Sequence, residues 1–111
     1  MQRSGKILAV DDSNQFRLII ETFLSSEGYQ VITCESGETA LQILEQHTDI
    51  DLVLLDVIMP TGLDGFETLR YIRSHARMAL VKVIMLTSAN EASDIIKAFE
   101  MGADDYVTKP F

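Results

Sequence analysis

The amino-acid sequence predicts an α/β domain built on a doubly wound, five-stranded parallel sheet. Five short apolar segments, rich in β-branched residues and leucine, alternate with stretches of helical periodicity, which is the pattern of successive βα units. The chain has 111 residues, enough for one domain, and no linker, repeat or low-complexity stretch interrupts the alternation. Right-handed crossovers place helices on both faces of such a sheet, and the strand order 2-1-3-4-5 is the leading topology.

The strands are expected where short apolar runs are most continuous. A parallel sheet is covered on both faces, so its strands lack the strict polar and apolar alternation of a half-exposed sheet. The expected strands cover residues 6–10, 30–34, 52–56, 82–86 and 105–108, with the middle ones at the centre.

The first helix follows the first strand and has one apolar face. Ser13 is its expected N-cap, and Gly28 follows its last turn. The apolar positions of this helix are Phe16, Ile19, Ile20, Phe23 and Leu24.

The other three helices also carry boundary signals. Ser36 can cap the second, and Asp64 with Glu67 three residues later forms an acidic variant of the capping box for the third. The fourth is expected over about residues 91–101, and Gly102 suits the left-handed position after its end. The expected core positions are Ala40, Leu41 and Leu44 in the second helix, Phe66, Leu69 and Ile72 in the third, and Ile95, Ala98 and Phe99 in the fourth.

Composition and charge exclude several classes of protein. Lys and Arg number 9 against 17 Asp and Glu, and the net charge of -8 would repel a phosphate backbone, so we expect no direct nucleic acid binding by this chain. No apolar run approaches the ~18 residues of a membrane span, and the first residues lack the apolar region of a secretory signal. The single cysteine, Cys34, allows no intrachain disulfide and is expected to be half-buried at a strand end. These features predict a cytoplasmic protein without membrane association.

Reactive side chains stand at the ends of the expected strands. Asp11 and Asp12 follow the first strand, and Asp56 ends the third. Thr87 follows the fourth strand and Lys109 follows the fifth. Open parallel sheets bind ligands beyond the carboxyl ends of their strands, so these five side chains should share one rim.

The three carboxylates on this rim predict a metal site. At a separation of about 5 Å and an effective dielectric near 20, each pair repels by roughly 3 kcal/mol, so the three cannot all stay ionised unaided. Hard oxygen ligands at a phosphate site suit Mg²⁺. The alternative for each aspartate alone is a helix cap or a solvated loop acid. Three acids, one hydroxyl and one lysine on the same rim favour the metal site.

Asp56 is the expected phosphoacceptor. It ends a central strand, and a carboxylate can attack phosphorus to form an aspartyl phosphate. Phosphoryl transfer depends mainly on positioning and charge neutralisation, which Asp11 and Asp12 would serve by holding the metal. Lys109 would supply a second cation, and Thr87 would donate its hydroxyl to a phosphoryl oxygen.

Four segments closely resemble the receiver domains of bacterial response regulators and hybrid kinases, the chemotaxis-regulator-like modules of two-component signalling. They are residues 7–13 (ILAVDDS), 51–60 (DLVLLDVIMP), 83–88 (VIMLTS) and 102–111 (GADDYVTKPF), and they span nearly the whole chain. The resemblance implies the flavodoxin-like receiver fold. It also implies a phosphoryl acceptor and switch rather than an enzyme, with at most self-phosphorylation and self-dephosphorylation. The implied partner is a histidine kinase or a phosphotransfer protein.

The resemblance implies a metal site and a switch. The Mg²⁺ ligands would be Asp11, Asp12, Asp56 and the backbone carbonyl of Ile58. On phosphorylation Thr87 would move toward the phosphoryl group while the ring of Tyr106 turns inward. The alternative for Tyr106 is an ordinary strand residue with its hydroxyl at the surface.

Two further groups of residues take roles from the resemblance alone. The peptide between Lys109 and Pro110 would be cis, which would position the lysine. The kinase would dock on the first helix and on the loop after the fifth strand. Its expected contacts are Gln15, Leu18 and Phe111.

Two features depart from the family pattern. The loop at residues 60–65 (PTGLDG) is one residue longer than the commonest family form, which leaves the loop geometry beside Asp56 open. The sequence ends at Phe111, where the family's fifth helix would begin, so we expect a receiver domain over residues 1–111 that is truncated before that helix. An apolar strip along the fourth and fifth strands would then be exposed, and a homodimer, a partner chain or another helix would cover it.

Three other functions fit parts of the pattern. A haloacid-dehalogenase-type phosphohydrolase also uses an aspartyl nucleophile but needs a second acid where this chain has Ile58. A flavin-binding, flavodoxin-like module would need a hydroxyl-rich phosphate loop where Asp11 and Asp12 repel phosphate. A pseudo-receiver, an interaction module that is never phosphorylated, remains open, although such a module loses part of its pocket and this pocket is complete in sequence.

Overall fold

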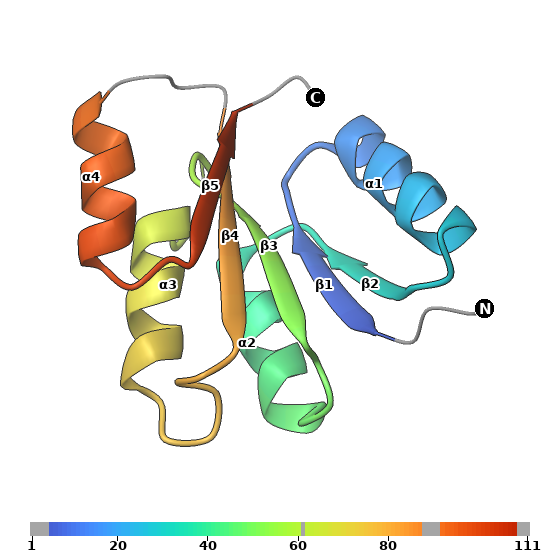
Figure 1. Ribbon diagram of the computed structural model, residues 1–111, viewed down its shortest axis with the longest axis horizontal. Helices are drawn as coiled ribbons and strands as arrows, with labels where there is room; N and C mark the ends of the chain where they lie inside the picture. The colour runs from blue at the N-terminus through green and yellow to red at the C-terminus, as the bar shows by residue number, and fades with distance from the viewer. Residues whose placement is uncertain (1–4, 61, 88–91, 109–111) are drawn as a thin grey trace.

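The computed structural model describes residues 5–60, 62–87 and 92–108 (Figure 1). Five parallel strands form one sheet in the order β2-β1-β3-β4-β5, which confirms the predicted topology. Thr87 pairs with Thr108, so β4 extends one residue beyond the predicted end, and the other strand bounds agree with the prediction. The strands are β1 (Lys6–Val10), β2 (Gln30–Cys34), β3 (Leu52–Asp56), β4 (Lys82–Thr87) and β5 (Asp105–Thr108).

Four helices among the described residues connect the strands. They are α1 (Asn14–Ser26), α2 (Gly37–Gln46), α3 (Gly65–Ser74) and α4 (Ala92–Glu100). Ser13 and Ser36 cap α1 and α2, each accepting a hydrogen bond of 3.2 Å from a backbone N–H of the first turn. Asp64 and Glu67 form both hydrogen bonds of the predicted capping box at α3. The predicted start of α4, Glu91, lies outside the described residues.

Two apolar layers hold the helices to the sheet. The larger layer combines inward residues of α2, α3 and α4 with alternate strand residues such as Leu8, Val53 and Met85. The smaller layer lies on the other face of the sheet, where Ile20 of α1 packs with Ala9 and Leu86. Figure 1 accordingly shows α1 set apart from the other three helices. No helix in the described part of the chain has the length and apolar character needed to cross a membrane.

Three expected burials differ in the structure. Phe99 was expected in the core but is 48% exposed, because α4 turns Ala98 and the half-buried Ile95 toward the sheet and leaves Phe99 at the edge of that face. Cys34 is buried rather than half-buried, and burial raises the pKa of its thiol to about 11. Only part of the apolar face of α1 is covered, since Ile19 and Phe23 are 59% and 61% exposed.

The apolar strip expected along the fourth and fifth strands is partly covered, because Ile84 and Val107 are half-buried and pack against the smaller layer. A further apolar surface is a groove of about 330 Å³ between α1 and β3. Its lining residues are Ile19, Ile20, Phe23, Leu24 and Leu54.

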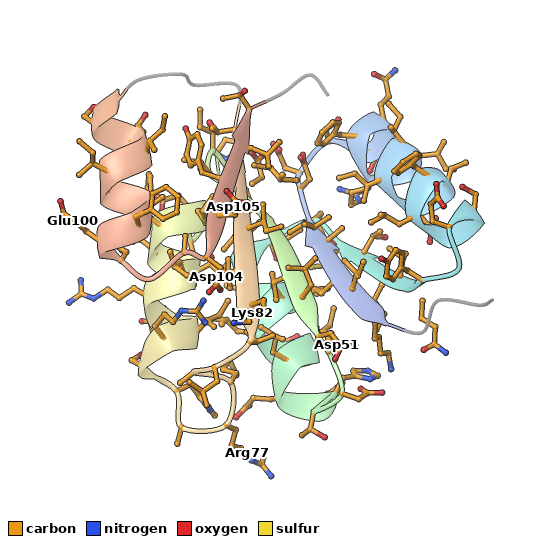
Figure 2. All side chains as sticks on the ribbon, viewed as in Figure 1. Asp51, Arg77, Lys82, Glu100, Asp104 and Asp105 are labelled. Carbon is orange, nitrogen blue, oxygen red and sulfur yellow. The ribbon has the colours of Figure 1, made fainter. Side chains whose placement is uncertain are left out.

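Arg73, in the last turn of α3, joins three segments of the chain. Its Nε atom donates to the carbonyl of Gly102 at 2.8 Å, and Nη1 donates to the carbonyl of Val81 at 2.6 Å. Its Nη2 atom lies 2.9 Å from Oδ2 of Asp104, whose other oxygen is 4.0 Å from Nζ of Lys82. Figure 2 shows Asp104 and Lys82 near each other below β5. The half-buried guanidinium therefore ties α3 to the segments before β4 and before β5.

Replacing Arg73 with methionine should lower the free energy of unfolding by about 2 to 3 kcal/mol. Methionine keeps an apolar stem but leaves the carbonyls and the carboxylate of Asp104 without their charged donor. Urea unfolding measures the loss. Arg70→Met is the matched control, because Arg70 is exposed on the same helix and its replacement should cost less than about 0.5 kcal/mol. Equal small effects of the two substitutions would contradict the role assigned to Arg73.

Candidate functional site

The site lies at the carboxyl ends of the central strands. β1 and β3 are neighbours in the sheet although α1, β2 and α2 separate them in sequence. Val10 pairs with Leu55, so Asp11 and Asp56 leave the sheet side by side. Asp56 pairs with Leu86 of β4, which places Thr87 at the same rim. The chain passes to opposite faces of the sheet after β1 and β3, and an open parallel sheet binds its ligands at such a point.

Three carboxylates meet at this rim. One oxygen atom from each of Asp11, Asp12 and Asp56 lies within 4.8 Å of the other two. Asp11 is 1% exposed and Asp56 is 5% exposed, while Asp12 is open to solvent. At this separation each ionised pair repels by roughly 3 kcal/mol at an effective dielectric near 20. The cluster therefore could bind a metal ion, and its all-oxygen ligand set fits a hard divalent cation such as Mg²⁺.

Asp11 is held in place through its backbone and its side chain. Its N–H donates to the carbonyl of Cys34 at 3.1 Å, and its Oδ1 accepts from the N–H of Ser13 at 2.9 Å. Its carbonyl accepts from Nη1 of Arg17 at 2.6 Å, and Arg17 also bonds the side chain of Asn14. Arg17 was not singled out from the sequence, because its position on α1 has no apolar or capping signature.

The backbone after Asp56 makes a closed loop. The N–H of Val57 donates to the carbonyl of Leu86 at 2.9 Å, and the N–H of Gly65 donates to the carbonyl of Val57 at 2.9 Å. A Cβ atom on Gly65 would overlap the carbonyl oxygen of Asp56 and stand 2.7 Å from Cα of Val57. The first residue of α3 must therefore be a glycine for the helix to start this close to Asp56. Ile58, in the same loop, is exposed.

Thr87 and Tyr106 are in contact. Thr87 is fully buried at the end of β4, and Tyr106 of β5 is half-buried. Partial burial raises the pKa of the Tyr106 phenol above its usual value; a side-chain hydrogen bond with Thr87 lowers it, and the negative charge of Asp94 raises it. Thr87 and Tyr106, the pair expected to form the switch, are therefore already linked in the structure.

The remaining site residues divide into exposed ones and undescribed ones. Gln15 and Leu18 are exposed on α1, Leu18 at 62%, so both are accessible to a partner. Lys109, Pro110 and Phe111 lie outside the described residues. The predicted second cation, cis peptide and third kinase contact therefore stay predictions.

Comparison with known proteins identifies the family. The family model for the response regulator receiver domain matches residues 7–111. The transcriptional regulatory protein GltR of Pseudomonas aeruginosa is 42% identical over 112 aligned residues, covering 100% of this chain and 46% of that protein. This chain therefore spans less than half the length of that curated relative.

Solved structures agree with this assignment. The chemotaxis protein CheY4 of Vibrio cholerae has a TM-score of 0.91 and 30% identity, with 98% of this chain and 89% of that chain covered. The signal receiver domain of a signal transduction histidine kinase from Syntrophus aciditrophicus has a TM-score of 0.86 and 33% identity, with 96% and 80% covered. The family model and these similar proteins support neither the phosphohydrolase nor the flavin-binding alternative. The chain belongs to the response regulator receiver domains, which are signalling modules of two-component systems and in general not enzymes.

Proposed function

We propose that this domain takes a phosphoryl group from a histidine kinase, or from a phosphotransfer protein, onto Asp56. The observation that carries the proposal is the buried carboxylate of Asp56 within 4.8 Å of the carboxylates of Asp11 and Asp12. A buried acid at the end of a central strand is well placed to act as a nucleophile but needs a cation to approach a phosphate.

Each residue of the site has one part in the transfer. A carboxylate oxygen of Asp56 attacks phosphorus, the bond from phosphorus to the donor's imidazole nitrogen breaks, and the product is an aspartyl phosphate. Mg²⁺, when bound, supplies the charge neutralisation that this step requires. Asp11, Asp12 and the carbonyl of Ile58 would hold it with Asp56. Lys109 would neutralise a second phosphoryl oxygen.

Thr87 and Tyr106 would carry the signal away from Asp56. The phosphoryl group offers Thr87 a new hydrogen-bond acceptor, and the ring of Tyr106 would follow inward because its hydroxyl is linked to Thr87. The hydrogen bond from Thr87 to the phosphoryl group can exist only while that group is present, which makes it a switch. We further propose that the domain can phosphorylate itself from small donors and dephosphorylate itself, without other enzymatic activity.

Two surfaces would serve partners. Gln15 and Leu18, exposed on α1, and Phe111 would contact the kinase. A second copy of the domain, or a helix from a partner, would cover the apolar groove between α1 and β3. The net charge of -8 argues against direct nucleic acid binding by this chain. A cytoplasmic location follows from the proposed kinase partner.

Intact-mass measurement after incubation with acetyl phosphate tests the proposed chemistry. The wild-type chain should gain about 80 Da in the presence of Mg²⁺, the mass of one phosphoryl group. A sample held in EDTA should gain nothing. A folded chain that binds Mg²⁺ yet never gains the mass would indicate a pseudo-receiver and overturn the proposal.

A further inference from the structure

The loop after Asp56 contains Ile58, the residue expected to lend its carbonyl to the metal. The hydrogen bonds of Val57 and Gly65 close the loop at its base. Ile58, whose carbonyl is the expected metal ligand, lies just beyond that base and is exposed. A loop one residue longer than the commonest family form has more conformations available, so it loses more entropy when it is ordered. What holds the middle of the loop therefore affects the metal site.

Glu38, in the first turn of α2, reaches this loop. Its Oε2 atom accepts a hydrogen bond of 3.0 Å from the N–H of Leu63, 25 residues further along the chain. Gly62 lies directly under the same carboxylate, because a Cβ atom built there would be 2.8 Å from Cδ of Glu38. The side chain of Leu63 also packs against the start of α2, since a Cβ atom on Gly37 would be 3.2 Å from its Cβ. Leu63 is thus held by a hydrogen bond and by packing, while Gly62 lies in close contact with the Glu38 side chain.

The carboxylate of Glu38 is not needed to start its own helix. Ser36 caps α2 by accepting from the N–H of Thr39. An exposed glutamate in a first helical turn is ordinarily explained by its attraction to the helix dipole. That explanation depends on the charge of Glu38 alone, whereas the bond to Leu63 depends on an acceptor oxygen at the end of the side chain.

We propose that Glu38 is a positioning residue for the metal site. By holding Leu63 it keeps the loop against α2 and thereby fixes the backbone of Ile58 beside Asp56. This inference rests on the proposed function, because it assigns Glu38 a part in binding the Mg²⁺ that the transfer to Asp56 requires. Glu38 is not among the expected metal ligands, so its role would be to act through the loop.

Three variants separate the hydrogen bond from the charge. Glu38→Ala should weaken Mg²⁺ binding by about 5-fold, less than the 10-fold to 100-fold typical of partners that bond a metal ligand directly, because Glu38 acts one step further away. Glu38→Gln keeps an acceptor oxygen and should stay within about 2-fold of the wild type. Glu45→Ala removes the same charge from an exposed position of the same helix and should leave Mg²⁺ binding unchanged.

Two measurements on each folded variant give the outcome. Magnesium chloride titration, followed by the NMR shifts of the backbone amides around Asp11 and Ile58, gives the dissociation constant. Hydrogen exchange of the Leu63 amide without metal reports the bond itself and should be about 10-fold faster in Glu38→Ala than in the wild type or in Glu38→Gln.

The results distinguish this inference from the proposed function. Equal defects in Glu38→Ala and Glu38→Gln would show that only the charge matters and would overturn the inference. Unchanged Leu63 exchange or unchanged Mg²⁺ affinity in Glu38→Ala would overturn it as well. If the wild type binds Mg²⁺ and shows the Glu38 effects but never takes a phosphoryl group, the proposed transfer fails and the role of Glu38 stands. A wild type that does not bind Mg²⁺ overturns both.

Discussion

Replacing Asp56 with asparagine is expected to abolish phosphoryl incorporation and, at the same time, to stabilise the metal-free domain by about 1 to 2 kcal/mol. The first effect follows because an amide oxygen is too weak a nucleophile to form a phosphoryl bond. The second follows because Asp56 is one of three carboxylates within 4.8 Å of one another. Its neutral replacement removes two of the three repelling pairs.

The expected gain is smaller than the sum of the two pair repulsions. Each pair repels by roughly 3 kcal/mol at an effective dielectric near 20, but Asp12 is exposed and water screens its charge. A net effect of about 1 to 2 kcal/mol remains.

Urea unfolding with and without Mg²⁺ measures this effect. In EDTA the Asp56→Asn variant should be more stable than the wild type. With Mg²⁺ the wild type should gain stability and the variant should gain less, because the variant has lost a metal ligand and a ligand stabilises only the state that binds it. Glu21→Gln, which neutralises an exposed acid on α1, should change neither value. A variant less stable than the wild type in EDTA would show that repulsion does not dominate the cluster.

Much of the fold could be predicted from local patterns. The strands are short apolar runs bounded by polar residues, and the caps Ser13, Ser36 and Asp64 act within their own helices. The close approach of three aspartates could be expected as well, because parallel strands bring their carboxyl ends to one edge. Features of this kind can be predicted because they depend only on the neighbouring sequence or on the sheet topology.

The sequence was less informative where distant segments meet. Arg73 and Glu38 bond partners 31 and 25 residues away, and no periodicity marks either of them. The exposure of Phe99 depends on how α4 is rotated about its axis relative to the sheet. The spacing of the apolar residues defines the buried face of the helix only to within about one residue position. Such features depend on tertiary geometry, so they required the structure.

Replacing Gly65 with alanine is expected to lower the free energy of unfolding by about 3 kcal/mol and to slow phosphorylation by about 10-fold or more. Alanine normally stabilises a helix over glycine by about 1 kcal/mol, so helix propensity alone predicts the opposite sign. Here the added Cβ atom would overlap the carbonyl oxygen of Asp56, and it would stand 2.7 Å from Cα of Val57 and 2.9 Å from the carbonyl carbon of Asp56. All three are backbone atoms, which cannot move aside as a side chain can.

The relief of this overlap should displace the acceptor. Gly65 donates to the carbonyl of Val57, so the helix start and the residue after Asp56 move together. A shift of about 1 Å at a reacting group can cost on the order of 100-fold in rate. A displacement of Asp56 by only part of that distance would therefore account for the expected loss of about 10-fold or more. The rate of mass gain from acetyl phosphate at saturating Mg²⁺ measures the loss.

Gly5→Ala is the matched control for Gly65→Ala. Gly5 directly precedes β1, at the end of that strand that lies away from the site. A Cβ atom on Gly5 would stand 3.2 Å from a ring atom of Tyr29, and this side chain can shift. That variant should fold and accept phosphoryl groups at the wild-type rate. If Gly65→Ala instead matched this control in both stability and rate, the start of α3 would have room for a side chain. The close packing of α3 on Asp56 would then not be what positions the acceptor.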